Sequence, residues 1–552
     1  MTLPPVAADP DATAGAAAVA AAARAGVRTM FTLSGAHVFP LYDAAHRGAA
    51  PLRMIDVRHE ASAVFAAEAV GKLTRTPGFA VVTAGPGVTN AVSPVTQAHF
   101  SGAPVVVFGG RAPELTWGRG ALQEMDQAPL FTTITKSSAT AHTPDEVGAL
   151  TAAAFTAAST AHRGPAFVEA GIDVLFAPAG DLGTAEPGPG GRPAPDEESV
   201  AEIARLLREA RRPIVILGSD VWADGAEQAA LDFVTALDLP AIGNGMGRGI
   251  LPPTHPGCVT RARRAAFTQC DVAIVVGAPL DFRIGYGTFG PAGTDTPVIH
   301  IADSTDQIAT HRTLAASAAG DLGGILRTLC DLVGGPGGWR EWRSGLREQA
   351  DAAGAADAPL LTAGGDLIHP ARIYGELLPR LGDDAIVIGD GGDFVSWAGR
   401  FVQPARPGRW LDPGPFGCLG AGLGAAIGAR AADPDAPIVL LLGDGAAGMS
   451  LMDLDTLVRH DLPVVIVVGN NSAWGLEKGP MQLLYGYDIL ADLAPGTRYD
   501  KVASALGGAS ELVDRPGDIG PALDRALASG TPYLLNVLTD PAAAYPRSTT
   551  GL

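Results

Sequence analysis

The stretch VLLLGDGAAGMSLMDLDTLVRHDLPVVIVVGNN, residues 439–471, contains the pattern that decides the fold. An apolar run ends in Gly-Asp-Gly (443–445), a segment of helical periodicity follows, and a second apolar run ends in Asn-Asn (470–471). A strand, a helix and another strand in this order are typical of parallel sheets covered by helices. If the two strands are neighbours, both end at the same edge of the sheet, which is the edge where such sheets bind ligands.

Two polar residues at this edge are candidate metal ligands. Asp444 follows the first strand and Asn471 follows the second. A carboxylate, an amide oxygen and a backbone carbonyl are hard oxygen ligands, which suit a Mg²⁺ ion that also takes phosphate oxygens. The glycines allow backbone N–H groups and the start of a helix to approach the phosphates. An earlier Gly-Asp-Gly (389–391) has no paired asparagines at this spacing, so we interpret Asp390 as a turn residue.

The pattern resembles the motif of the thiamine diphosphate (ThDP) enzymes, in which Gly-Asp-Gly precedes a helix, a strand and paired asparagines. The resemblance implies that Asp444, the side chain of Asn471 and the carbonyl of Ala473 hold Mg²⁺ on the diphosphate. The family's apolar support for the bent cofactor corresponds here to Leu419. Further cofactor-binding residues implied by the resemblance are Gly392, Asp393, Phe394, Gly417, Gly443, Gly445, Ala446, Ala447, Trp474 and Gly475.

The segment 52–92 resembles the family region that carries the acid which activates the cofactor. Glu60 takes that position, where a carboxylate on the pyrimidine ring favours the imino tautomer that deprotonates the thiazolium carbon. The alternative for Glu60 is an acid in the first turn of a helix that stabilises the helix dipole. We interpret Glu68, two turns later, as structural. The resemblance adds four cofactor-binding residues, Gly35, Ala36, Pro86 and Asn90.

The family builds each active site between two chains. The resemblance therefore implies a homodimer or homotetramer, in which Glu60 of one subunit meets the diphosphate site of the other.

Strand-like apolar runs alternate with helical patterns along the whole chain, which predicts three doubly wound parallel-sheet α/β domains. By the resemblance these are a pyrimidine-binding domain (1–180), a central Rossmann-like domain (195–345) and a diphosphate-binding domain (365–552). Segments 177–199 and 350–370 are predicted linkers. The runs that we expect to form strands are 27–33, 52–57, 79–84, 104–110, 165–172, 212–218, 271–277, 296–303, 384–390, 436–444, 462–470 and 532–540.

The composition excludes several classes of protein. With 47% hydrophobic and 18% charged residues, the chain of 552 residues is expected to fold into large cores. A net charge of −19 without a basic patch argues against nucleic-acid binding. No run is long and apolar enough to span a membrane, and the N-terminus lacks the basic start of a signal peptide. Four scattered cysteines favour a reducing cytoplasm.

Within the ThDP enzymes, the chain resembles acetolactate synthase large subunits, in particular an actinobacterial branch. The segments TLSGAHVFPLYDA (32–44) and LQEMDQAPLFTTITK (122–136) carry this resemblance. Gln123 falls on the family's active-site glutamine, and the alternative is a surface amide of a helix. His37 either faces the cofactor or caps a turn. The implied reaction decarboxylates one 2-oxo acid and adds the enamine to a second carbonyl.

The segment NNSAWGLEKGPMQLLYG (470–486) departs from the acetolactate synthases. Glu477 stands where they have an apolar residue, and Pro480 stands where they have a tryptophan that lines the substrate. The segment resembles ThDP decarboxylases and 2-hydroxyacyl-CoA lyases, in which a glutamate handles protons at the reacting carbon. The alternative for Glu477 is a solvated acid beside Lys478.

These departures keep other functions open. One is a 2-hydroxyacyl-CoA lyase or oxalyl-CoA decarboxylase, and another is a decarboxylative coupling enzyme that takes an acyl thioester in specialised metabolism. A cofactor-binding regulatory paralogue is the non-enzymatic alternative, but it predicts loss of Glu60, Asp444 or Asn471, and all three are present.

The central block resembles the region that holds FAD in acetolactate synthases and ADP in oxalyl-CoA decarboxylase. A basic cluster there is a candidate phosphate contact, with ordinary surface charge and an empty pocket as the alternative. The cluster consists of Arg261, Arg263, Arg264 and Arg283.

Overall fold

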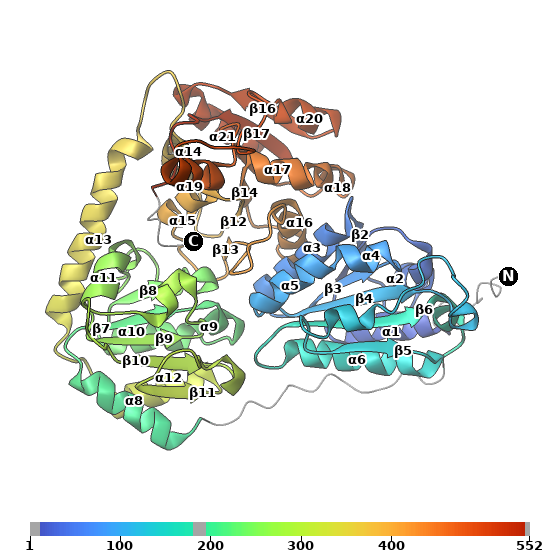
Figure 1. Ribbon diagram of the computed structural model, residues 1–552, viewed down its shortest axis with the longest axis horizontal. Helices are drawn as coiled ribbons and strands as arrows, with labels where there is room; N and C mark the ends of the chain where they lie inside the picture. Colours follow the sequence, from blue (N-terminus) through green and yellow to red (C-terminus); the bar gives the residue numbers. More distant parts are fainter. Residues whose placement is uncertain (1–11, 180–194, 547–552) are drawn as a thin grey trace.

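The computed structural model describes residues 12–179 and 195–546. It consists of three α/β domains, each with one parallel sheet between helices (Figure 1). This arrangement confirms the fold class predicted from the sequence. No helix within the described ranges is long and apolar enough to cross a membrane.

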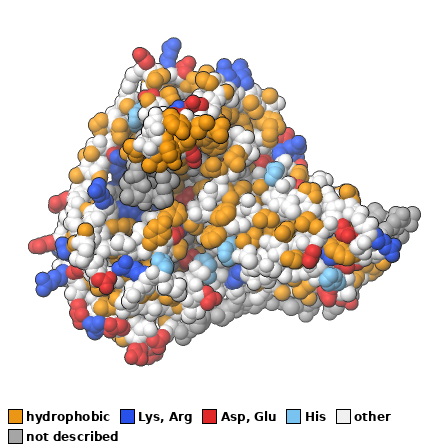
Figure 2. Space-filling view, in the orientation of Figure 1, with side chains coloured by type: hydrophobic (Ala, Val, Ile, Leu, Met, Phe, Trp, Pro, Cys, Tyr) orange, Lys and Arg blue, Asp and Glu red, His pale blue; other side chains and the backbone are white. Residues whose placement is uncertain are grey.

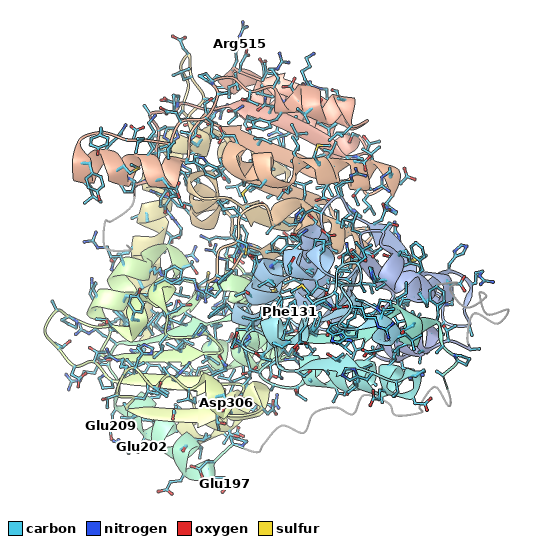
Figure 3. The ribbon with its side chains drawn as sticks, turned by 45° about the vertical axis from the view of Figure 1, so that its right-hand side comes forward. Phe131, Glu197, Glu202, Glu209, Asp306 and Arg515 are labelled. Atoms are coloured by element: carbon cyan, nitrogen blue, oxygen red, sulfur yellow. The ribbon has the colours of Figure 1, made fainter. Side chains whose placement is uncertain are left out.

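The N-terminal domain has a six-stranded sheet in the order β2-β1-β3-β4-β6-β5. Phe131 and Phe167 stack inside it with their ring centroids 4.1 Å apart, and Figure 3 labels Phe131 there. The strands are β1 (Thr29–Thr32), β2 (Arg53–Asp56), β3 (Gly78–Val82), β4 (Val105–Arg111), β5 (Ser138–Ala141) and β6 (Pro165–Gly171). The helices are α1 (Ala14–Arg24), α2 (Phe39–Arg47), α3 (Glu60–Thr74), α4 (Pro86–Asn90), α5 (Val92–Phe100), α6 (Pro144–Ser159) and α7 (Ile172–Phe176).

The central domain has a five-stranded sheet in the order β11-β10-β9-β7-β8. Its first helix is amphipathic, because it buries Val200, Ile203 and Leu207 while its glutamates face solvent (Figure 3). The strands are β7 (Pro213–Leu217), β8 (Ala241–Gly243), β9 (Val272–Val276), β10 (Val298–Ala302) and β11 (Ala316–Ala319). The helices are α8 (Glu197–Glu209), α9 (Ser219–Ala223), α10 (Glu227–Ala236), α11 (Arg263–Gln269) and α12 (Leu322–Val333).

The C-terminal domain has a six-stranded sheet in the order β13-β12-β14-β15-β17-β16. The strands are β12 (Ile386–Asp390), β13 (Trp410–Leu411), β14 (Ile438–Gly443), β15 (Val465–Asn470), β16 (Ala509–Val513) and β17 (Tyr533–Leu538). The helices are α14 (Pro370–Leu377), α15 (Asp393–Phe401), α16 (Gly422–Ala432), α17 (Asp444–Ser450), α18 (Leu454–Arg459), α19 (Gly475–Tyr485), α20 (Tyr499–Ala505) and α21 (Ile519–Ala528).

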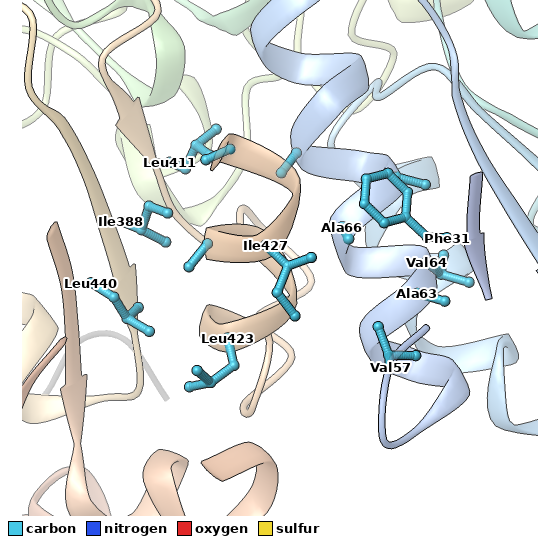
Figure 4. Close-up of a cluster of buried hydrophobic side chains, with 14 of the residues drawn as sticks. Phe31, Val57, Ala63, Val64, Ala66, Ile388, Leu411, Leu423, Ile427 and Leu440 are labelled. Carbon is cyan, nitrogen blue, oxygen red and sulfur yellow. The ribbon is translucent and has the colours of Figure 1, made fainter. Parts of the chain in front are cut away.

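The N-terminal and C-terminal domains share one hydrophobic core, in which α3 packs against α16 (Figure 4). A Cβ atom at Gly428 would lie 2.1 Å from the carbonyl oxygen of Ala66, and one at Gly424 would lie 2.8 Å from that of Ser62. Residues without a side chain at these two positions allow the helices to approach closely. A hydrogen bond of 2.5 Å from Ser62 Oγ to Asp453 adds a polar contact between the same two domains.

One of the predicted linkers is largely helical. Residues 350–361, predicted as linker, belong to the helix α13 (Arg340–Leu361), which runs from the central to the C-terminal domain along one side of the molecule (Figure 1). The helix is anchored near its start, where Trp342 donates a hydrogen bond to the carbonyl of Pro213 and Leu346 is buried. Its alanine-rich second half favours helix even with little burial. Most of the other linker, residues 180–194, lies outside the described residues.

Candidate active site

Asp444 begins α17 at the carboxyl end of β14, and β15 lies beside β14 with Gly469 opposite Gly443. Its carboxylate is buried and accepts hydrogen bonds from the N–H groups of Ser472 (2.7 Å) and Gly445 (3.1 Å). Burial raises the pKa of Asp444 to about 6, although these hydrogen bonds oppose the shift. A bound cation would favour its charged form.

The loop after β15 brings Asn471 to the same edge. Its Oδ1 accepts a hydrogen bond from the N–H of Ala473 (3.1 Å). Ser472 has a φ of +58°, a left-handed conformation that non-glycine residues seldom adopt. A neighbouring segment fixes this turn, because Leu493 donates to the carbonyl of Ser472 and Trp474 donates to that of Ala491.

The other residues predicted to bind the cofactor beside Asp444 lie close together, as the contacts at three glycines show. A Cβ atom at Gly445 would lie 2.4 Å from the ring of Trp474, and one at Gly475 would lie 2.9 Å from Cβ of Asp393. One at Gly392 would lie 2.5 Å from Leu476. The starts of α15 and α19 therefore meet beside Asp444, and helix starts supply free N–H groups for phosphate oxygens.

Some predicted cofactor residues have side chains elsewhere. The side chain of Phe394 lies in the core, where a Cβ atom at Gly469 would be 2.4 Å from its ring. Ala446 and Ala447 are buried, and Glu477 is exposed on α19. Phe394, Ala446 and Ala447 can contact a ligand at this edge of the sheet through their backbone atoms. Glu477 can reach such a ligand from the solvent side.

Gly417 and Leu419 lie on the loop between β13 and α16, and Leu419 is half-buried. Asp390 fixes this loop, because its carboxylate accepts hydrogen bonds from the N–H groups of Gly420 (3.2 Å) and Gly422 (2.7 Å). Burial raises the pKa of Asp390 to about 6. The structure thus gives Asp390 a supporting role beneath the loop.

A second group of predicted residues lies in the N-terminal domain around Glu60. Glu60 is the first residue of α3 and is 7% exposed. Its Oε2 accepts a hydrogen bond of 2.9 Å from the side-chain amide of Asn90, the last residue of α4, which begins at Pro86. Its Oε1 lies 3.6 Å from where a Cβ atom at Gly87 would be, so glycine keeps this oxygen uncovered on that side.

His37 and Gln123 lie near the start of α4. Nδ1 of His37 is 3.1 Å from the hydroxyl of Thr83, and Gly35 packs against the same threonine. Ala36, between Gly35 and His37, is exposed. Burial lowers the pKa of His37, with a backbone hydrogen bond at Leu122 opposing the shift. Gln123 has a φ of +61°, and its Cβ packs against Gly85.

A buried polar network that none of the sequence motifs indicated lies beneath this group. Gln127 accepts a hydrogen bond from the N–H of Gly85 (2.6 Å) and donates to the carbonyl of Gly110 and to Glu169. Glu169 is fully buried and also accepts from Thr140, and burial raises its pKa. The sequence did contain one indication of this network, which is the glutamate inside the apolar run 165–172. A buried acid requires polar partners, so its presence in a buried strand implies such a network.

Among the described residues, Glu60 and Asn90 form no hydrogen bond or ion pair with Asp444 or Asn471. The domains that carry the two groups do touch, because Ser62, two residues after Glu60, donates a hydrogen bond to Asp453.

Three family models match the chain in order. All three describe thiamine pyrophosphate (TPP) enzymes, and TPP is another name for ThDP. The N-terminal TPP binding domain matches residues 12–130, the central domain matches residues 200–329, and the C-terminal TPP binding domain matches residues 390–537. A probable acetolactate synthase from Mycobacterium bovis and an acetolactate synthase large subunit from Mycobacterium tuberculosis are each 46% identical over 95% of both chains. The chain belongs to the thiamine pyrophosphate enzyme family. A 2-hydroxyacyl-CoA lyase 2 from Caenorhabditis elegans is 34% identical over 91% of this chain and 85% of the relative.

This ThDP enzyme also has a cavity of about 670 Å³ where its three domains meet. Of the four arginines predicted to contact a phosphate, Arg283 lines this cavity. Arg261 instead pairs with Asp357 of α13, and Arg263 donates to the carbonyl of Arg283. The four arginines therefore do not all line this cavity, and Arg261 and Arg264 line a separate surface pocket. Lys136 also lines the cavity, and burial lowers its pKa to about 8.

Proposed function

We propose that this ThDP enzyme is a Mg²⁺-dependent carboligase of the acetolactate synthase type, which decarboxylates one 2-oxo acid and joins the remaining fragment to a second carbonyl. The observation that carries the proposal is the presence of two complementary half-sites, a buried Glu60 held by Asn90 and a buried Asp444 beside Asn471. The 46% identity to acetolactate synthases supports this reaction over the alternatives.

Asp444, the side chain of Asn471 and the carbonyl of Ala473 are proposed to hold the metal ion. They fit Mg²⁺ because all three donors are oxygens and because a cation would favour the charged form of the buried Asp444 carboxylate. Backbone N–H groups at the starts of α15 and α19 are proposed to hold the diphosphate. Bound ThDP supplies an electron sink for the carbon–carbon bond that breaks.

Glu60 is proposed to exchange the proton that activates the cofactor. Asn90 holds Oε2 of Glu60, which leaves Oε1 as the atom that takes or gives the proton. Gln123 and His37 are proposed to orient the substrate from the same side, with His37 neutral because burial lowers its pKa. Glu477 is exposed in the single chain and is proposed to protonate intermediates from α19.

A second copy of the chain is proposed to complete each site, as a homodimer or as pairs within a homotetramer. Apolar side chains gather at the top of the molecule, over α19 and the residues that follow it (Figure 2). Such contiguous apolar surface marks an interaction site rather than a solvated face. The exposed residues are Leu483, Leu484, Tyr485, Tyr487, Ile489 and Leu490, the last of which is 91% exposed.

The test is a product analysis of the purified protein supplied with ThDP, Mg²⁺ and pyruvate. We expect acetolactate, and we expect Glu60→Gln to lower kcat by about 10²–10⁴-fold, because it removes a general acid–base group. Glu197→Gln on the exposed face of α8 is the matched control and should keep wild-type turnover (Figure 3). Wild-type turnover by Glu60→Gln at saturating ThDP would refute the role of Glu60.

A 2-hydroxyacyl-CoA lyase is the second candidate, supported by the 34% identity to such lyases and by the acidic Glu477 on α19. An oxalyl-CoA decarboxylase or an enzyme that couples acyl thioesters belongs to the same alternative. Incubation with 2-hydroxyacyl-CoA and with oxalyl-CoA distinguishes these activities. Cleavage of either thioester without acetolactate from pyruvate would favour this candidate over the carboligase.

FAD or ADP is proposed as a ligand of the cavity between the domains, where Arg283 is one of the basic side chains that could contact a phosphate. A yellow purified protein would identify the flavin, and chromatography of the small molecules released by denaturation would identify ADP. All four cysteines are free thiols, which supports a cytoplasmic location.

A further inference from the structure

Three side chains from two domains converge beside the cavity. His162 precedes β6 of the N-terminal domain, whereas Asp220 and Asp303 follow β7 and β10 of the central domain. β7 and β10 flank β9 in a parallel sheet, so both carboxylates lie at its ligand-binding edge. One nitrogen and two carboxylate oxygens, one from each residue, lie within 4.8 Å of one another.

The imidazole of His162 faces the carboxylates of Asp220 and Asp303. Nδ1 of His162 is 3.1 Å from the nearer carboxylate oxygen of Asp303 and 3.7 Å from Oδ1 of Asp220. The backbone of Gly102 covers the other edge of the ring, because a Cβ atom there would lie 2.6 Å from Nε2. The ring therefore presents Nδ1 to the two carboxylates.

Asp220 supplies an independent indication of a ligand. It is 7% exposed, yet in the described chain its carboxylate accepts no hydrogen bond and faces His162. Asp303, which is 2% exposed, lies in the same cluster. Without a bound ion, His162 is the group that faces both carboxylates. A divalent cation held between the three groups would stabilise both carboxylates, including that of Asp220, which accepts no hydrogen bond in the described chain.

The cluster is accessible, because His162 and Asp220 both line the cavity of about 670 Å³. We propose that His162, Asp220 and Asp303 bind a divalent transition-metal ion of the Zn²⁺ class, which links the N-terminal and central domains and leaves a coordination position open to the cavity. An imidazole with two carboxylates suits such ions, whereas Mg²⁺ prefers oxygen ligands. This site is separate from the proposed Mg²⁺ site at Asp444.

The test uses the full-length protein saturated with ThDP and Mg²⁺, with Co²⁺ as the probe because its visible absorption reports the coordinating atoms. After removal of excess Co²⁺, the wild type is expected to retain about one more Co²⁺ per chain than Asp220→Asn, with absorption bands of nitrogen and oxygen ligation. Asp220→Asn keeps the size of the side chain and removes one of the two carboxylates that face His162. Asp303 still pairs with His162 in this variant, so we expect it to fold, which a melting curve without Co²⁺ checks.

His162→Gln should lower the Co²⁺ affinity at least about tenfold, because it removes the nitrogen ligand. His99→Gln is the matched control, since His99 also lines the cavity but lies outside the cluster, and it should bind Co²⁺ like the wild type. The proposal is overturned if the wild type retains no more Co²⁺ than Asp220→Asn. The cluster would then be an ion pair of His162 with the two aspartates and not a metal site.

Discussion

His37 lies buried between Thr83 and the backbone at Leu122, and burial lowers its pKa below the ordinary value of 6.5. As the pH falls through 6.5, the unfolded chain takes up a proton at His37 before the folded chain does, so stability is lost with acidification. We expect the melting temperature of the wild type to fall more steeply from about pH 7 to pH 5 than that of His37→Gln, which does not titrate there.

The control for this measurement is His46→Gln, because His46 is exposed near the end of α2. It should follow the wild-type curve. Parallel curves for the wild type and His37→Gln would contradict the burial argument.

At single residues, the sequence predicted where Asp444 and Asn471 lie but not the contacts that hold their surroundings in place. Asp444 and Asn471 were found because their spacing encodes a strand, a helix and a strand that return to one sheet edge. The contacts of Asp390 with Gly420 and Gly422 depend on a loop that folds back from residues some thirty positions later, and no local pattern encodes that return. Gln127 was missed for the same reason, since its partners Gly85, Gly110 and Glu169 come from three separate segments.

At the scale of elements, all twelve predicted apolar runs correspond to strands, and the five strands that were missed all lie at sheet edges. An edge strand has a neighbour on one side, so it needs less apolar sequence than a strand buried inside a sheet. The tetrapeptide SATA of β5 illustrates this difference. The missed strands are β5, β8, β11, β13 and β16.

The packing of α3 against α16 gives a prediction at this scale. Gly428→Ala places a methyl group where the carbonyl of Ala66 already lies, so the two helices must separate. We expect a loss of about 1–3 kcal/mol in unfolding free energy, the usual cost of overpacking, seen as a lower midpoint of denaturant unfolding.

The matched control is Gly354→Ala on α13, where no atom lies within 4 Å of the new methyl group. It should stabilise the protein by about 0.5–1 kcal/mol, because alanine restricts the unfolded chain and favours helix. An equal effect of the two substitutions would show that close approach at Gly428 is unimportant.

At the scale of the whole molecule, the proposed reaction requires Glu60 and Asp444 to act on one cofactor, although they lie in different domains and form no hydrogen bond with each other in the described chain. In the proposed symmetric pair of chains, Glu60 of each copy would face Asp444 of the other, and each pair would have two equivalent sites. The apolar surface on α19 supports such an association. The arrangement is testable by mixing two inactive variants, Glu60→Gln and Asp444→Asn.

Co-expression of the two variants produces hybrid pairs as about half of all pairs when association is random. In a hybrid, one site combines the intact Glu60 of one copy with the intact Asp444 of the other, and the second site carries both substitutions. We therefore expect the co-expressed mixture to recover about a quarter of wild-type activity, while each variant alone stays inactive. If each site belonged to one chain, every site in the mixture would carry a substitution, and the absence of any recovery would reject the shared site.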